Sequence, residues 1–396
     1  MSDSEYNVPY ANESSAWLST LDKTILTIKP HLIIPEFILA TFATFLNIFH
    51  FFILTRKSMR STSINVMMAG IAFCDIFIMI VHAYEKRFIF QEPIGKCTPP
   101  LGLIKTIVNL SADSFRDFFR RVSTWLAVIM ALVRLLIIRN PLNPKYANLS
   151  QPAFAWKIIG VLMLLSALVF ICFYAPFKFE GVPWTPPEQC LNFPSNFIAK
   201  YYIVDLVDTF FSINAIIIMN INIILHGLLK VRRTINKSNI LFQIIPAILL
   251  PILTILLVRE LKKASEQRKK MMGQKTDKDH DHTTKLVFIM TISFSIAEGP
   301  IGMMSVGEVV FPDFSVPYLI CGHSLELLSI LVVVNATVHC LICMTMSSQY
   351  QSCVKSLFGC GAKLKTVAVT QKSSTCSVTS VRNVIVDLST NPARRN

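Results

Sequence analysis

The chain has 396 residues, of which 53% are hydrophobic and only 16% are charged, and its mean hydropathy is +0.52. Because a soluble globular domain carries about 25% charged residues, this composition argues against a soluble protein. The formal net charge is +14, but the lysine and arginine residues cluster in loops between apolar runs. This pattern orients membrane proteins, and we therefore expect a lipid bilayer and no nucleic acid as the partner.

The apolar residues gather into runs of roughly 20 residues, the length that a helix needs to cross ~30 Å of hydrocarbon. The eight runs cover residues 31–54, 64–84, 112–138, 154–176, 203–229, 239–258, 286–310 and 316–346. Backbone groups inside a bilayer must bond to one another, and the short alternating segments of a membrane β-barrel are absent from the sequence. We therefore predict an all-α membrane protein, a bundle of seven transmembrane helices.

The N-terminal segment and the first loop predict the orientation. Residues 1–30 are polar and mixed in sign, whereas the loop after the first run carries Arg56, Lys57 and Arg60. Positive residues favour the cytoplasm, so we expect residues 1–30 to form an extracellular tail at the plasma membrane. A sequon at Asn12 would then be a glycosylation site.

Eight crossings would put both ends of the chain on the same side of the membrane, so one of the eight runs should not cross it. The position of a basic loop indicates which run this is. This loop follows residues 239–258 and should be cytoplasmic. We therefore predict 239–258 as the fifth membrane helix. The run 203–229 becomes an extracellular, interfacial or re-entrant segment of a long second extracellular loop, 177–238, in which Asn236 could be glycosylated.

The seven-helix domain is thus expected to cover residues 31–346. Residues 347–396 would be cytoplasmic, with a short helix on the inner leaflet and a disordered tail rich in Ser and Thr. Cys353 and Cys360 lie near this helix and are candidates for palmitoylation, with unmodified thiols as the alternative.

Several motifs resemble those of rhodopsin-like G-protein-coupled receptors. At the end of the third predicted helix, Arg134 and Pro141 keep the spacing of the family signature, while Val133 replaces its usual acidic residue. In the sixth helix, Pro300 matches the family proline and Glu298 stands where the family usually has Trp.

The seventh predicted helix contains Asn335-Ala336-Thr337-Val338-His339, which resembles Asn-Pro-x-x-Tyr with Ala for Pro and His for Tyr. Together these departures resemble one branch, the nematode serpentine chemoreceptors of class W, which are related to FMRFamide-type peptide receptors. The resemblance covers roughly residues 31–358. It implies that Arg134, with Pro141 after it, meets a heterotrimeric G-protein in a cytoplasmic cleft that opens on activation.

The resemblance also implies two features of the helix bundle. The family joins the loops that hold Cys97 and Cys190 by a disulfide, and two free thiols are the alternative. Asp75, Ser123 and Asn335 resemble the family's sodium pocket, and the alternative is a hydrogen-bonded polar cluster without an ion. We expect no other cofactor and no metal centre.

Charged residues follow one face of the third predicted helix. That face contains Arg116, Arg120, Ser123, Ala127 and Arg134, because successive positions are three, four or seven residues apart. Asp117 and Arg121 lie beside it. Such arginines should face a watery cavity or acidic partners, for which Glu298 and Glu326 are available. Two interpretations stay open: a pocket that binds a carboxylate or carbonyl groups of a peptide, and an internal network of ion pairs.

We therefore predict a receptor, not an enzyme, that binds an extracellular ligand and activates a heterotrimeric G-protein. The charged pocket favours a neuropeptide over a small apolar odorant, although a chemosensory receptor for small environmental molecules is the near alternative. A transporter or channel and a non-signalling membrane protein are alternatives from other classes.

Overall fold

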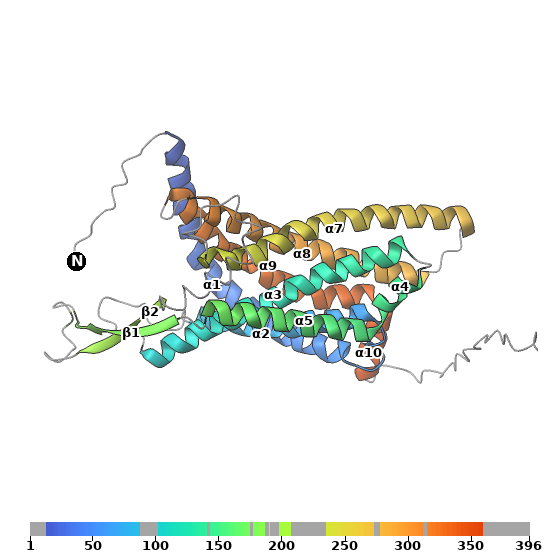
Figure 1. Ribbon diagram of the computed structural model, residues 1–396, viewed down its shortest axis with the longest axis horizontal. Coiled ribbons are helices and arrows are strands. Elements are labelled where there is room, and N and C mark those ends of the chain that lie inside the picture. Colours follow the sequence, from blue (N-terminus) through green and yellow to red (C-terminus); the bar gives the residue numbers. More distant parts are fainter. Residues whose placement is uncertain are drawn as a thin grey trace, which may run out of the picture. The chain divides into compact units, whose positions relative to one another are not determined.

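Seven long helices lie side by side in the part of the chain that the structure, a computed structural model, describes (Figure 1). The described residues are 13–87, 102–140, 143–174, 177–186, 190, 198–206, 235–272, 278–311 and 315–358. The long helices are α1 (Glu13–Leu54), α2 (Ser63–Lys86), α3 (Leu103–Arg139), α5 (Pro152–Tyr174), α7 (Ile235–Met272), α8 (Lys278–Val310) and α9 (Val316–Met346). The short ones are α4 (Pro144–Ala147), the 3₁₀ turn η2 (Asn148–Ser150) and α10 (Ser348–Leu357).

Six of the described helices are long and apolar enough to cross a membrane. These are the stretches Trp17–Leu54, Ser63–Lys86, Leu103–Arg139, Pro152–Ile171, Leu286–Glu308 and Val316–Met346. The helix α7 joins them by packing against α3 and α8. Large apolar side chains such as Phe45 and Leu164 are exposed on the faces that would contact lipid. The predicted all-α membrane bundle is confirmed.

Two helices begin at side chains that cap their first turns. The hydroxyl of Thr62 accepts a hydrogen bond from the amide of Asn65 at the start of α2, and Ser315 does the same for Tyr318 at the start of α9. Each cap satisfies an amide that has no partner within its own helix. Pro317 lies in the first turn of α9, where its missing N–H costs nothing.

Helix α1 begins at Glu13, so the predicted start at residue 31 is too late. The added turns are polar, and the apolar run does not reveal them. Their charged side chains find partners on α9: Asp22 lies 2.7 Å from His323, and Lys29 forms an ion pair with Glu326. Because these partners belong to another helix, a reading of local hydropathy misses this extension.

The predicted loop after the fourth membrane helix contains an antiparallel pair of strands. Strand β1 (Phe177–Trp184) pairs with β2 (Ala199–Leu206), with Phe177 opposite Leu206. The first residues of the apolar segment 203–229 therefore lie in a strand, and the rest of that segment is outside the described residues. Residues 239–258 lie in α7.

Small residues allow three pairs of helices to approach closely: α7 with α8, α2 with α3, and α2 with α5. A Cβ added at Gly302 of α8 would lie 2.2 Å from the Cβ of Ala247 in α7. A Cβ at Gly70 of α2 would lie 3.1 Å from side-chain atoms of both Leu126 and Ile159, on α3 and α5. These positions set the distance between neighbouring helices.

Helix α10 is anchored to the bundle through Tyr350, whose side chain is fully buried. The Tyr350 hydroxyl lies 3.0 Å from His50 Nδ1 on α1. Beside it, Gln349 donates a hydrogen bond of 2.7 Å to the carbonyl oxygen of Ser58. The short helix expected after residue 346 is therefore present, and its first turn is held by polar contacts. Its place on the inner leaflet stays a prediction.

Candidate functional site

A charged cavity of about 460 Å³ lies between the last turns of α2 and the first half of α3. Its walls come from α2, α3, α8 and α9, and acidic and basic side chains outnumber apolar ones. The lining residues are His82, Glu85, Lys86, Asp113, Arg116, Asp117, Arg120, Ile301, Leu325, Glu326, Ser329 and Val332. Of the residues predicted to bind ligand, Arg116, Asp117, Arg120 and Glu326 are among them.

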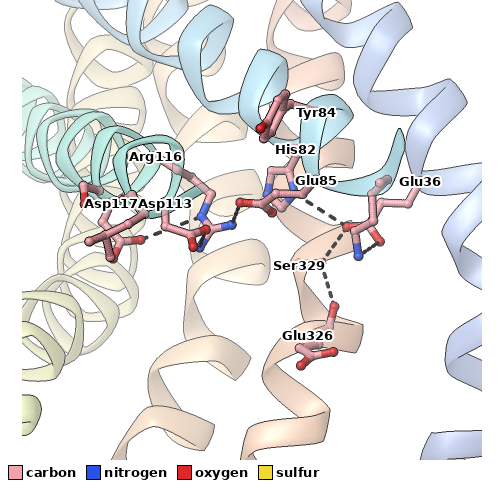
Figure 2. Close-up of polar contacts among 12 residues, drawn as sticks. Glu36, His82, Tyr84, Glu85, Asp113, Arg116, Asp117, Glu326 and Ser329 are labelled. Atoms are coloured by element: carbon pink, nitrogen blue, oxygen red, sulfur yellow. Dashed lines mark hydrogen bonds and ion pairs between the residues drawn. The ribbon is translucent and has the colours of Figure 1, made fainter. Parts of the chain in front are cut away.

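Arg116 of α3 is the centre of an acidic cluster (Figure 2). Its guanidinium donates to Glu85 of α2, and it lies 3.2 Å from Asp113 and 3.8 Å from Asp117 on its own helix. A guanidinium presents five N–H donors in a fixed plane, so a single Arg can bind several carboxylates. Three carboxylates around one Arg leave this part of the cavity with an acidic excess.

One turn further along α3, Arg120 binds α8. Its Nη2 atom lies 3.1 Å from Oε2 of Glu298, whose side chain is only 8% exposed. Glu326 of α9, the other acid expected to pair with these arginines, instead forms an ion pair with Lys29 of α1. Arg121 is buried but is not among the residues that line the cavity.

Glu36 of α1 is a member of this network that the sequence analysis did not identify. Its side chain is 4% exposed, and its carboxylate lies 2.8 Å from Lys86 Nζ and 3.8 Å from His82 Nδ1. The Ser329 hydroxyl of α9 donates to it at 2.6 Å (Figure 2). Glu36 was detectable, because a lone acid in an apolar run indicates a functional or paired residue.

The second polar cluster lies deeper in the bundle, around Asp75 of α2. The Ser123 hydroxyl donates to Asp75 Oδ1 at 3.2 Å, and His339 Nδ1 of α9 lies 3.3 Å from Oδ2. Asn335 Oδ1 accepts a hydrogen bond of 2.5 Å from Ser293 of α8. Asp75 Oδ1 and Asn335 Oδ1 thus accept hydrogen bonds from hydroxyl groups, whereas Asp75 Oδ2 and both His339 nitrogens are buried without a hydrogen-bond partner in the described part of the chain.

Arg134 lies near the opposite end of α3 from the cavity and has no ion-pair partner among the described residues. Val133, the residue in place of the usual acid, is buried and apolar. Nearby, Arg139 lies 3.9 Å from Glu260 of α7. The local ion pair that the resemblance leads one to expect for Arg134 is thus missing, as Val133 suggests, whereas Pro141 lies outside the described residues.

The remaining predicted sites are only partly described. Cys190 is buried and is joined in a disulfide bond, while Cys97 lies outside the described residues, so their pairing stays a prediction. Asn12 and Cys360 are also outside them, and Asn236 lies in the first turn of α7. Cys353 is a free, partly exposed thiol 3.1 Å from the Ser58 hydroxyl.

Comparison with known proteins relates this architecture to receptors. The chain is 23% identical to sex peptide receptor-related protein 2 of Caenorhabditis elegans, over 82% of this chain and 70% of the relative. It is also 23% identical to the sex peptide receptor of Drosophila melanogaster, over 77% and 67%. A third relative, the G-protein coupled receptor dmsr-1 of C. elegans, is 23% identical over 62% of this chain and 45% of its own length.

The match to a family extends over almost the whole helix bundle. Residues 34–361 match the family described as serpentine type 7TM GPCR chemoreceptor Srw. This range includes the cavity and both polar clusters. The chain therefore belongs to this family of multi-pass membrane receptors.

Proposed function

We propose that the chain is a plasma-membrane receptor that binds an extracellular peptide in the charged cavity and activates a heterotrimeric G-protein. The observation that supports the ligand class is the wall of the cavity, where four acidic and three basic side chains surround about 460 Å³. Such a wall matches the charged ends, side chains and carbonyl groups of a peptide, whereas an apolar odorant would leave its charges without partners. One relative is named a sex peptide receptor, and another is named as a protein related to the sex peptide receptor.

The ion pairs suggest how ligand binding would change the bundle. Arg120 and Glu298 join α3 to α8, and Lys29 and Glu326 join α1 to α9. A peptide that binds Arg120 through a carboxylate or carbonyl would compete with Glu298 and release α8. A ligand shifts a conformational equilibrium only if it binds the two states with different affinities. Here the peptide would bind more tightly to the state in which Arg120 has left Glu298.

Arg134 is proposed as the contact for the G-protein at the other end of α3. Its guanidinium has no ion-pair partner among the described residues, so little holds it in place. Outward movement of α8, which contains Pro300, would open a cleft beside it. The proposed orientation puts the N-terminus outside the cell and the C-terminus inside. The basic residues that support it, among them Arg259, Lys262 and Lys263, were predicted to form a loop but lie in the C-terminal part of α7.

The test is a screen of a peptide library against cells that express the full chain with a promiscuous Gα subunit. Once a peptide is found, Arg120→Ala should abolish its binding, whereas Lys105→Ala, which removes an exposed positive charge of the same helix, should leave it unchanged. Arg134→Ala should retain peptide binding and lose G-protein activation. Full binding by Arg120→Ala would exclude the proposed cavity, and full activation by Arg134→Ala would exclude the proposed coupling contact.

Epitope tags at both ends test the orientation independently of any ligand. On intact cells, an antibody should reach only the N-terminal tag. Exposure of both tags on the same side would contradict an odd number of membrane crossings.

A further inference from the structure

Asp75 is a buried acid with a charge that the bundle has to compensate. It lies in the membrane-spanning part of α2 and is only 5% exposed. A carboxylate in such a place is stable as an anion only if a cation or hydrogen-bond donors surround it. Two kinds of partner could do this: a bound metal ion, or side chains of the chain itself.

The nearest group that can carry a positive charge is the imidazole of His339. Its Nδ1 atom lies 3.3 Å from Asp75 Oδ2, while the other oxygen, Oδ1, accepts the hydrogen bond from Ser123. Nδ1 and Oδ2 lie within ion-pair distance but are not hydrogen-bonded, since neither has a hydrogen-bond partner among the residues that the structure describes. Both oxygens of Asp75 thus face groups of the protein.

The His339 ring is held in this position from the side of α8. Its centroid lies 4.5 Å from that of Phe294, and its side chain is 1% exposed. The ring is therefore enclosed between the carboxylate on α2 and an aromatic ring on α8. An ion could bind Oδ2 from this direction only if the ring moved away, and a densely packed interior opposes such movement.

The third oxygen expected around an ion is also engaged. Asn335 lies one helical turn before His339 on α9, and its Oδ1 accepts a short hydrogen bond from Ser293. A hard cation needs several oxygen atoms with free lone pairs. Here Asp75 Oδ1 and Asn335 Oδ1 each accept a hydrogen bond from a hydroxyl group, on α3 and α8 respectively. Asp75 Oδ2 accepts no hydrogen bond among the described residues, but the His339 ring of α9 lies 3.3 Å from it and covers it.

We propose that His339 occupies the position beside Asp75 that a sodium ion would otherwise take, and that this receptor holds its polar core together without sodium. The imidazole then performs the structural task of the ion, which is to join α2 to α9 through Asp75. Packing of Phe294 on the same ring extends the connection to α8, the helix that Arg120 holds at the other polar cluster.

The experiment measures the thermal unfolding of the full chain in lipid nanodiscs, in NaCl and in KCl at equal ionic strength. The wild-type protein should have the same melting temperature in both salts. His339→Ala should melt at a lower temperature and should gain a sodium-specific stabilisation, because the space beside Asp75 becomes available to an ion. Asp75→Asn in the His339→Ala background should remove that gain.

His50→Ala is the matched control. His50 is another buried histidine, with a partner on α10, and its loss should lower the melting temperature equally in both salts. If His339→Ala does not fold, His339→Asn is used in its place, because Asn also leaves most of the ring volume empty. A sodium-specific stabilisation of the wild-type protein that Asp75→Asn abolishes would overturn the proposal. A His339 variant that folds but gains no sodium-specific stabilisation would also overturn the proposal.

Discussion

Arg120 of α3 and Glu298 of α8 form an ion pair of 3.1 Å beside the charged cavity, in a part of the bundle where neither side chain is much exposed to solvent. The pair joins a helix that ends near Arg134 to the helix whose movement would open the opposite end of the bundle. Ligand binding in the cavity could therefore change the position of α8 through this contact.

Removal of one member of this pair should cost more stability than removal of both. Arg120→Ala leaves Glu298 buried without its partner, and we expect the free energy of unfolding to fall by about 3 kcal/mol, the order seen for broken buried pairs. Arg120→Met combined with Glu298→Gln should restore most of that loss, because no isolated charge remains. Thermal unfolding of four proteins, the wild type, Arg120→Met, Glu298→Gln and the double variant, forms a double-mutant cycle that measures the coupling energy. Additive losses would show that the two residues do not interact.

Two glutamates that bind lysines should differ in their contributions to stability. Glu36 is 4% exposed and binds Lys86, while Glu326 is 53% exposed and binds Lys29. Glu36→Gln should destabilise the bundle by about 3 kcal/mol because it leaves Lys86 partly buried without its counter-charge. Glu326→Gln should cost less than about 1 kcal/mol, since solvent screens an exposed pair. Melting temperatures in nanodiscs compare the two, and equal shifts would contradict the difference in burial.

The close contact of α7 and α8 should not tolerate a larger residue at Gly302. Its added methyl group would lie 2.2 Å from the Cβ of Ala247. Gly302→Ala should therefore lower stability by about 1–3 kcal/mol through overpacking and reduce the amount of receptor at the cell surface. Gly160→Ala is the control, because a Cβ at Gly160 of α5 meets no atom within 4 Å. Ala247→Gly should partly rescue Gly302→Ala, and failure of this rescue would place the conflict elsewhere.

The hydroxyl of Tyr350 should hold α10 against α1. Burial raises the pKa of Tyr350 above its ordinary value, so the hydroxyl stays neutral and remains available for its contact with His50. Tyr350→Phe keeps the ring and removes this contact, which should cost about 1–3 kcal/mol by leaving the buried His50 nitrogen without a partner. Hydrogen exchange should become faster in the first turns of α10 and stay unchanged in α5. Unchanged exchange in α10 would show that apolar packing alone holds it.

The sequence was informative about the helices because hydropathy is a local property. Runs of hydrocarbon length predicted the bundle, and the charges inside those runs predicted that the α3 arginines would pair with Glu298 and Glu326. In the structure Glu298 pairs with Arg120, whereas Glu326 pairs with Lys29 of α1. The same approach missed the first turns of α1, where Asp22 and Lys29 are stabilised by His323 and Glu326 on α9. A pattern in neighbouring residues carries no information about a partner that lies about 300 residues away in the sequence.

The sequence by itself determined that the chain crosses a membrane repeatedly as helices, and it identified Asp75 and the arginines of α3 as buried polar groups in need of partners. Only the tertiary structure decided which partners they have: Glu85 for Arg116, and His339 for Asp75. Hydrocarbon length and charge can be read along one helix, because lipid acts on each residue separately. The pairing of charges depends on the rotation and depth of every helix relative to its neighbours, and the packing of the whole bundle sets both.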